Sequence, residues 1–346
     1  MVLLRWITSP FRYGLAVLKR KIGKLGLVRM ELFLAFGNEK EIFIKGRIVE
    51  AYRQSRPSEN KNAFQNIIAA IRRYAGSSIP DVRVMLEYHH LRIEMVSDEE
   101  GIFEKRFDDP HPVTNNKEKA RLNIIKEPGI QPENEWIEID ILRYASDHDF
   151  GIISDIDDTI VVSHATKVGK KFWLSVSKNA YTRRPFPGVS EFYHLISEGG
   201  AHPVFYVSSS DWNLYDLIMD FLRYRNIPSG PILLKDLHVN LRNIWQSGGG
   251  DHGHKLDKIC LLMSLYKEMK FVLVGDSGQH DPELYSEVIQ KFRGRVIAVY
   301  IRRIDREDKE REKILNRYQP EVQVAWVKNT KEAIQHATQF LLSKKQ

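Results

Sequence analysis

Three aspartates lie within four positions of this 346-residue chain, directly after a short apolar run. The run from Phe150 to Ile153 predicts a buried strand, and Asp155, Asp157 and Asp158 follow it. Carboxylates this close together repel one another, so the cluster indicates a bound cation or a reaction at phosphorus. In an extended segment, the side chains of Asp155 and Asp157 point to the same side. One of them can therefore attack a phosphorus atom while the other transfers a proton.

Two simpler interpretations of this stretch compete with catalysis. One aspartate can cap a following helix while the others are solvated. A calcium loop that began at Asp155 would need Gly at its sixth position and Glu at its twelfth. The chain has Ile160 and Thr166 there, so the spacing argues against calcium and leaves the capping interpretation open.

Polar residues also end two later runs that predict strands. Ser208 follows the apolar residues 203–207, and Asp276 follows the residues 271–274 and Gly275. From residue 146 onwards, predicted strands alternate with predicted helices, which is typical of a doubly wound parallel sheet. Functional groups collect at the carboxyl ends of such strands, so we expect Asp155, Ser208 and Asp276 to converge. Alternatively, Ser208 caps the next helix and Asp276 only shapes a turn.

The order and spacing of these residues resemble the haloacid dehalogenase superfamily of aspartate-dependent phosphohydrolases. The four matching motifs are Asp155-x-Asp157-x-Thr159, Ser208 after a strand, Lys255 at the start of a helix, and Gly275-Asp276 followed by Asp281. This resemblance implies that Asp155 is the nucleophile, which forms an aspartyl-phosphate. It also implies that Asp157 acts as the general acid and then as the general base.

The same resemblance implies the cofactor and the other site residues. Mg²⁺ suits oxygen ligands, and the expected metal-binding residues are Asp155, Asp157 through its backbone carbonyl, Asp276 and Asp281. Ser208 is expected to hydrogen-bond a phosphoryl oxygen, and Lys255 to neutralise charge on the phosphate and the nucleophile. Asp281 is expected to orient Lys255 or a metal-bound water, and Lys258 is a rival for the role of Lys255. The expected substrate-binding residues are Thr159, Ser209 and His254.

Longer stretches resemble a narrower family. The segments YVSSSDWNLY (206–215), PFPG (185–188) and GDSGQHDPE (275–283) look like the catalytic domain of the actin-patch type of phosphatidate phosphatases. That domain would cover about residues 150–305. The family implies Mg²⁺-dependent hydrolysis of phosphatidate to diacylglycerol and phosphate. Two alternatives stay open: a phosphatase for another phosphomonoester, such as a soluble metabolite or a nucleic-acid 3′ end, and a non-catalytic membrane adaptor.

The first part of the chain has a different character. Residues 31–145 read mostly as strands, which predicts a small antiparallel β-sandwich ahead of the α/β domain. Residues 1–30 contain seven Lys or Arg and no acid, interleaved with apolar residues that include Trp6. This segment predicts either contact with an anionic membrane surface or a helix packed on the protein body. The predicted organisation is therefore a basic amphipathic segment (1–30), a β-sandwich-like domain (31–145) and a haloacid-dehalogenase-like phosphatase domain (146–346).

The composition limits partners and location. The net charge of +7 favours acidic partners, and we expect a phospholipid substrate and peripheral contact with an anionic membrane rather than nucleic acid. The Lys-rich insertion from Lys167 to Arg184 is a second candidate for that contact. The single cysteine, Cys260, fits a reducing compartment, and no apolar run approaches the ~20 residues that span a bilayer. We therefore expect a cytoplasmic protein with peripheral contact at the membrane surface, and the sequence does not define its oligomeric state.

Overall fold

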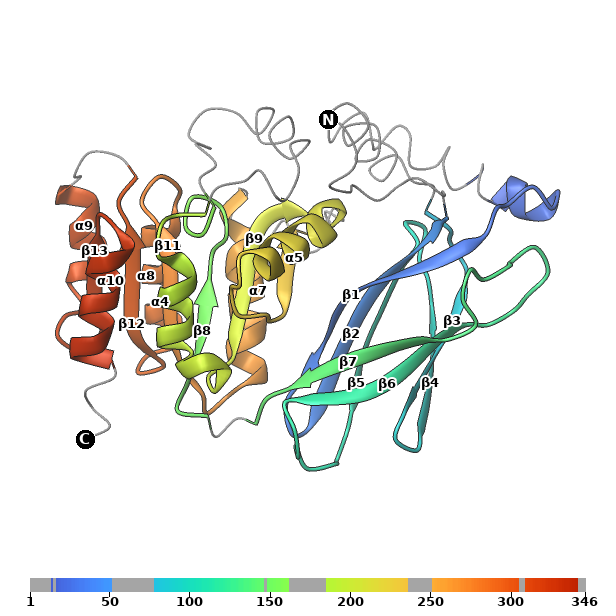
Figure 1. The fold of residues 1–346 in the computed structure, drawn as a ribbon, viewed down its shortest axis with the longest axis horizontal. Helices are drawn as coiled ribbons and strands as arrows, with labels where there is room; N and C mark the ends of the chain where they lie inside the picture. The colour runs from blue at the N-terminus through green and yellow to red at the C-terminus, as the bar shows by residue number, and fades with distance from the viewer. Residues whose placement is uncertain are drawn as a thin grey trace. The chain divides into compact units, whose positions relative to one another are not determined.

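A computed structural model describes residues 14, 17–51, 78–145, 148–161, 185–235, 251–304 and 309–341. The chain divides into two compact units, Met1–Tyr144 and Ala145–Gln346, and each is described by itself (Figure 1). Residues 1–13, 15 and 16 of the basic segment lie outside the described residues, as does the insertion from Lys167 to Arg184. Within the described ranges, no helix is long and apolar enough to cross a membrane.

The first unit is built on one seven-stranded sheet. Its strands are β1 (Val28–Gly37), β2 (Glu41–Glu50), β3 (Arg83–Tyr88), β4 (Leu91–Val96), β5 (Ile102–Asp108), β6 (Lys117–Ile124) and β7 (Ile137–Arg143). Their order is β4-β3-β6-β7-β1-β2-β5. The edge strands β4 and β5 contact each other, so the sheet curls into a nearly closed barrel (Figure 1). Its inward side chains, among them Ile44, Leu86, Phe103 and Leu122, form an apolar core.

This sheet differs from the antiparallel sandwich predicted from the sequence. It is a single sheet, and it is mixed because β1 and β7 run parallel. Alternation of apolar and polar residues predicts a half-buried strand, but the same alternation suits two packed sheets or one curled sheet. The pairing of β1 with β7 joins strands far apart in the chain, so no local pattern could specify it.

A buried arginine joins four segments of the first unit. Arg143, at the end of β7, is fully buried. Its guanidinium lies 2.7 Å from Asp109 and 3.4 Å from Glu118, and it donates a hydrogen bond of 2.8 Å to the backbone carbonyl of Asn38. A buried charge is tolerated only when it is paired and hydrogen-bonded. We therefore infer that this network fixes the turn after β1, the segment after β5, β6 and β7 together.

The second unit contains an entirely parallel six-stranded sheet, as the sequence predicted. Its strands are β8 (Phe150–Ser154), β9 (Val204–Asp211), β10 (Ile232–Lys235), β11 (Lys270–Asp276), β12 (Val296–Arg302) and β13 (Gln323–Val327). Their order is β10-β9-β8-β11-β12-β13, and all neighbours are parallel. β8 is buried along its whole length, which explains why its sequence is apolar without alternation.

Helices follow these strands along the chain. They are α4 (Val189–Ile196), α5 (Tyr215–Tyr224), α7 (Asp251–Leu265), α8 (Asp281–Lys291), α9 (Lys309–Asn316) and α10 (Thr330–His336). α4 packs against α10, and α8 packs against both α7 and α9 (Figure 1). Local signals set two of the helix starts. Pro282 lies in the first turn of α8, and the side chain of Asn329 caps α10 by accepting a hydrogen bond from the Glu332 N–H.

The strand order reverses between β8 and β11. Along the chain, β8, β9 and β10 follow one another across the sheet in one direction. The chain then returns to the other side of β8, and β11, β12 and β13 follow one another in the opposite direction. Crossovers between parallel strands are right-handed, so the two sets of connecting helices cover opposite faces of the sheet. In sheets of this kind, ligands bind at the carboxyl ends of the strands where the order reverses. β8 leads directly into Asp155 and β11 ends in Asp276, so both aspartates lie at this reversal.

Candidate active site

A compact turn holds the first acidic motif at the end of β8. The N–H of Asp155 donates to the carbonyl of Val274 on β11 at 2.9 Å, and the N–H groups of Ile160 and Val161 both donate to the carbonyl of Ile156. Asp158 has a φ of 56°, a conformation that aspartate tolerates better than most residues. Asp155 is only 2% exposed. The backbone therefore fixes the direction of a buried carboxylate.

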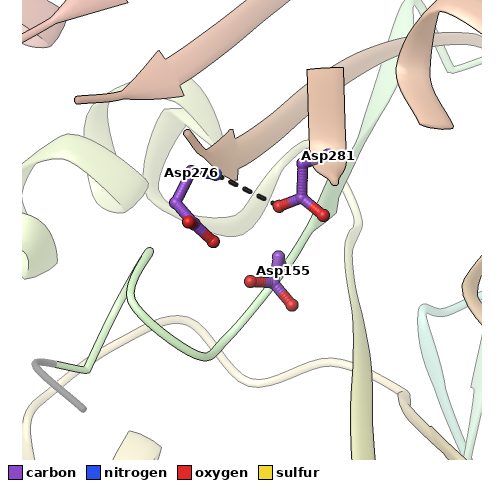
Figure 2. Close-up of side chains that lie close together, drawn as sticks. All are labelled: Asp155, Asp276 and Asp281. Atoms are coloured by element: carbon purple, nitrogen blue, oxygen red, sulfur yellow. Dashed lines mark hydrogen bonds between the residues drawn. The ribbon is translucent and has the colours of Figure 1, made fainter. Parts of the chain in front are cut away.

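Three carboxylates converge at this edge of the sheet. Asp155, Asp276 and Asp281 each offer an oxygen, and these oxygens lie within 4.8 Å of one another (Figure 2). All three side chains are buried. Figure 2 also shows the hydrogen bond of 3.1 Å from the Asp276 N–H to Asp281 Oδ2, which ties the last two together. The structure therefore brings together three of the four residues predicted to bind metal by their side chains or backbone.

The environment of these carboxylates favours a bound cation. Asp276 Oδ1 accepts hydrogen bonds from the N–H groups of Gly278 and Gln279, at 2.7 and 2.9 Å. Asp276 Oδ2 is buried and has no hydrogen-bond partner among the described residues. Burial and the nearby Asp281 raise the pKa of Asp276 to about 7. Burial also raises the pKa of Asp155 well above its ordinary value, against the opposing effect of Lys255. A hard divalent ion would satisfy the unpaired oxygen and offset this repulsion.

A buried ammonium completes the charge cluster. Lys255 Nζ lies 2.8 Å from Asp155 Oδ1 and 2.9 Å from Asp281 Oδ1. Burial alone would lower the pKa of Lys255, but the attraction of Asp155 and Asp281 outweighs it and raises that pKa. One ammonium faces three carboxylates, so the fully ionised cluster still carries excess negative charge. Lys255, and not its rival Lys258, forms these contacts with the cluster.

The position of Lys255 within its helix differs from the prediction. The lysine lies one turn inside α7, which begins at Asp251, rather than at the helix start. The glycine at 253 is tolerated in that first turn, although glycine costs about 1 kcal/mol in a helix relative to alanine. The prediction placed the boundary too late because glycine is a strong loop signal in a sequence.

The second aspartate of the motif is held by two serines. Ser208 Oγ donates a hydrogen bond of 2.9 Å to Asp157 Oδ2, and Ser210 Oγ donates one of 3.2 Å to the same oxygen. The contact of Ser208 with a phosphoryl oxygen stays a prediction, and in this structure Ser208 binds Asp157. Ser210 was missed. A signal for it existed, because residues two apart on an extended strand share a side, and β9 continues through both serines.

The remaining predicted residues are Thr159, Ser209 and His254, and Thr159 has a contact with the acidic cluster. Thr159 is buried, and its Oγ1 lies within hydrogen-bond reach of Asp155 Oδ2 at 3.4 Å. Ser209 is half-buried between the two serines that bind Asp157, and His254 is half-buried directly before Lys255 on α7. The assignment of Thr159, Ser209 and His254 to substrate stays a prediction. The site also contains Gln279, which no pattern in the sequence indicated, and which contacts both Lys255 and Asp157.

One family match lies within the second unit. Residues 150–303 match the family described as the catalytic domain of phosphatidate phosphatase APP1. Phosphatidate phosphatase APP1 of Saccharomyces cerevisiae is 31% identical over 160 residues, which cover 46% of this chain and 27% of the relative. An uncharacterised protein of Schizosaccharomyces pombe is 29% identical over 156 residues, 44% of this chain and 24% of the relative. The chain therefore spans about a quarter of the length of these curated relatives.

A solved structure shows only a weak similarity. The crystal structure of a carbohydrate acetylesterase from Xanthomonas citri covers 92% of this chain and 75% of its own, with a TM-score of 0.37 and 8% sequence identity. This similarity is too low to support an inference about fold or function.

The parallel sheet, with a buried acidic cluster where its strand order reverses, defines an α/β domain with a candidate active site. Residues 150–303 are similar to the catalytic-domain family of phosphatidate phosphatase APP1. The family match confirms the resemblance that the sequence motifs indicated over about residues 150–305.

Proposed function

We propose that this protein is a Mg²⁺-dependent phosphatase that hydrolyses phosphatidate to diacylglycerol and phosphate. The observation that carries the proposal is the convergence of Asp155, Asp276, Asp281 and Lys255 at one buried point, within residues that match the catalytic domain of a phosphatidate phosphatase family. Buried, mutually repelling acids have no structural use in an idle adaptor, because they reduce stability unless a ligand compensates them. The motif order further supports placement in the haloacid dehalogenase superfamily.

The proposed reaction has two steps. In the first, a carboxylate oxygen of Asp155 attacks phosphorus, the bond from phosphorus to the diacylglycerol oxygen breaks, and Asp157 gives that oxygen its proton. In the second, water attacks the phosphorus of the aspartyl-phosphate, Asp157 takes a proton from that water, and the Asp155 carboxylate is released with inorganic phosphate. Splitting one difficult displacement into two easier ones is the advantage of a covalent intermediate. The neighbouring positions of the two aspartates support these roles.

The other residues of the site stabilise charge in this scheme. Asp155, Asp276 and Asp281 would hold Mg²⁺ with the backbone carbonyl of Asp157, and the ion would neutralise charge on the phosphoryl oxygens when it is bound. Lys255 would favour the ionised form of Asp155 and add a fixed positive charge beside it. In this scheme, Ser208 donates its hydrogen bond to Asp157 in the free enzyme and to a phosphoryl oxygen when the substrate is bound.

The charge distribution of the chain supports binding to an anionic membrane. The whole chain carries a net charge of +7, and residues 1–30 contain seven Lys or Arg and no acid, so residues 31–346 are neutral overall. At the described end of that segment, Lys19 and Arg20 form ion pairs with Glu50 and Glu127 of the first unit. Leu18 and Ile22, one helical turn apart, are 53% and 54% exposed. The basic segment would thus be anchored to the protein body while it presents apolar and basic side chains to a lipid surface.

Residues 162–184 add a second basic segment, with six Lys or Arg and no acid. The residues on either side of it, Val161 and Pro185, pair with each other directly after the acidic motif. Positive charge connected to this edge of the sheet would favour an anionic lipid surface over a neutral one.

A phosphate-release panel tests the proposed activity. The full-length protein is assayed with phosphatidate in mixed micelles, a sugar phosphate and an oligonucleotide 3′-phosphate, each with Mg²⁺ and with a chelator. We expect release from phosphatidate that requires Mg²⁺, none after Asp155→Asn, and full activity after Asp257→Asn, an exposed aspartate on α7 that serves as the matched control. Preferential turnover of the sugar phosphate or the oligonucleotide would show that phosphatidate is not the preferred substrate. Full activity of Asp155→Asn would show that Asp155 is not the nucleophile.

A vesicle-binding assay tests the membrane contact separately. Four basic residues of the first segment are neutralised while Lys19 and Arg20 are kept for their ion pairs; the substitutions are Arg5→Gln, Arg12→Gln, Lys21→Gln and Lys24→Gln. The control neutralises four exposed lysines of the second unit, Lys267, Lys270, Lys328 and Lys331. We expect only the first variant to lose binding to anionic vesicles, by about 1 kcal/mol per charge removed. Equal binding by both variants would exclude residues 1–30 as the contact.

A further inference from the structure

The loop between β11 and α8 carries a glutamine that the reaction scheme does not use. Gln279 follows Asp276 by three residues and is half-buried. Its Oε1 accepts a hydrogen bond of 3.3 Å from Lys255 Nζ, and its Nε2 donates one of 3.2 Å to the backbone carbonyl of Asp157. One side chain thus connects the lysine on α7 with the turn that follows β8.

The amide of Gln279 satisfies both of these neighbours. An ammonium needs an acceptor, and a backbone carbonyl needs a donor. A carboxylate at position 279 could accept from Lys255 but would face the carbonyl of Asp157 with another oxygen. An apolar side chain would satisfy neither. The two contacts therefore define the orientation of the amide.

The backbone around Gln279 is fixed from two sides. On the side of the site, the N–H groups of Gly278 and Gln279 donate to Asp276 Oδ1. On the other side, Arg311 of α9 donates to the backbone carbonyl of Gln279, and its guanidinium is held by Glu283 of α8 at 2.7 Å. Arg311 also donates to the carbonyl of Ser277, so it binds the loop at two points. A planar guanidinium with several donors suits this task in a way that lysine does not.

We propose that Gln279 is a positioning residue for the cation site, and that Arg311 acts through it. Gln279 would set the direction of the Asp157 carbonyl, which the proposed function makes a cation ligand, and would keep Lys255 between Asp155 and Asp281. Residues that orient ligands in this way change metal affinity about 10- to 100-fold when they are replaced. The inference rests on the proposed function for the identity of the ligands, but its test does not depend on turnover.

The test measures Mn²⁺ binding to the full-length protein by calorimetry, without substrate. Gln279→Met keeps the size of the side chain and removes both hydrogen bonds, and we expect it to weaken Mn²⁺ binding about tenfold. Gln290→Met is the matched control, because Gln290 is an exposed residue of α8 that contacts Tyr318 outside the site. Gln279→Glu keeps the acceptor for Lys255 and loses the donor to Asp157, so it tests the second contact if Gln279→Met fails to fold.

Arg311→Met tests the anchor. If Arg311 acts through Gln279, the double variant binds Mn²⁺ no more weakly than Gln279→Met alone, whereas independent effects would add.

In the phosphatase assay we expect a lower kcat for Gln279→Met with an unchanged KM, since Gln279 does not contact the substrate in the proposed scheme.

The inference is overturned if folded Gln279→Met and Gln279→Glu bind Mn²⁺ as tightly as the unchanged protein, or if the unchanged protein binds no Mn²⁺. The proposed function fails in a different way: the unchanged protein and its variants would show the expected order of Mn²⁺ affinities while none of them hydrolysed phosphatidate.

Discussion

Replacement of Lys255 by methionine probes the charge balance of the site. Lys255 is 6% exposed, and its ammonium lies within 3 Å of two buried carboxylates, 2.8 Å from Asp155 and 2.9 Å from Asp281. Methionine keeps an unbranched apolar stem but leaves both carboxylates, together with the nearby Asp276, without the compensating charge. Removing one partner of a buried ion pair costs about 3–5 kcal/mol, because the other charge stays buried.

The predicted loss can be measured as a change in melting temperature. For a unit of about 200 residues, 1 kcal/mol corresponds to about 2–4 °C, so in chelator-containing buffer the second unit of Lys255→Met is expected to melt about 10 °C lower. Differential scanning calorimetry of the full-length protein measures this transition. Lys258→Met, three residues along the same helix, is the matched control and is expected to melt within about 2 °C of the unchanged protein.

A second substitution distinguishes a charge effect from a packing effect. Adding Asp155→Asn to Lys255→Met removes one of the unpaired carboxylates, so we expect part of the lost stability to return. The reasoning is refuted if Lys255→Met melts like Lys258→Met, or if Asp155→Asn lowers the melting temperature of the double variant further.

Three other outcomes follow from the same contacts. Asp276→Asn is expected to stabilise the chelator-treated protein by about 1–2 kcal/mol, because it removes a buried charge with an unpaired oxygen. The same variant is expected to show no rise in melting temperature when Mg²⁺ is added. A rise equal to that of the unchanged protein would contradict the assignment of Asp276 as a Mg²⁺ ligand. Gly275→Ala would place a Cβ 2.5 Å from Asp281 Oδ2, so calorimetry with Mn²⁺ should show binding weakened at least about tenfold, and unchanged binding would show that the cluster adapts. In the first unit, burial alone would raise the pKa of Asp109, but hydrogen bonds from His111 and the charge of Arg143 outweigh it and lower that pKa. Because the folded pKa is lower than the unfolded value of 3.8, the ionised Asp109 stabilises the first unit above that pH, and this stability is lost as the pH falls through the folded pKa. Circular dichroism should therefore show that the first unit of Asp109→Asn is less stable at pH 7 and less sensitive to acid below pH 4. An unchanged acid transition would contradict this.

The parts of the fold that the sequence predicted well are those with strong local signals. β8 is central in its sheet and buried throughout, so its apolar run is unbroken, and the acids at its end are conspicuous for that reason. The alternation of strands and helices predicted a parallel sheet, and the structure confirms it. In such a sheet the topology itself brings Asp155 and Asp276 to neighbouring strand ends.

Other features depend on contacts that no local pattern contains. One partner of β1 is the next strand, β2, but the other is the distant strand β7, so the curled mixed sheet could not be distinguished from a sandwich. The hydrogen bonds of Ser208 and Ser210 to Asp157 require the register of β8 against β9, which becomes known only in three dimensions. Gln279 lay within a motif already assigned for its acids, and nothing in its spacing indicated that its amide would contact two other motifs.

The most direct test of the central claim is to identify the residue that becomes phosphorylated. The full-length protein is mixed with phosphatidate and Mg²⁺, quenched in acid and reduced with borohydride, which converts an aspartyl-phosphate to homoserine. Mass spectrometry of the peptides then locates the modified position. Homoserine at position 155, and its absence when Mg²⁺ is chelated, is the predicted result. Continued turnover with an unmodified Asp155, or modification at another aspartate, would contradict the account.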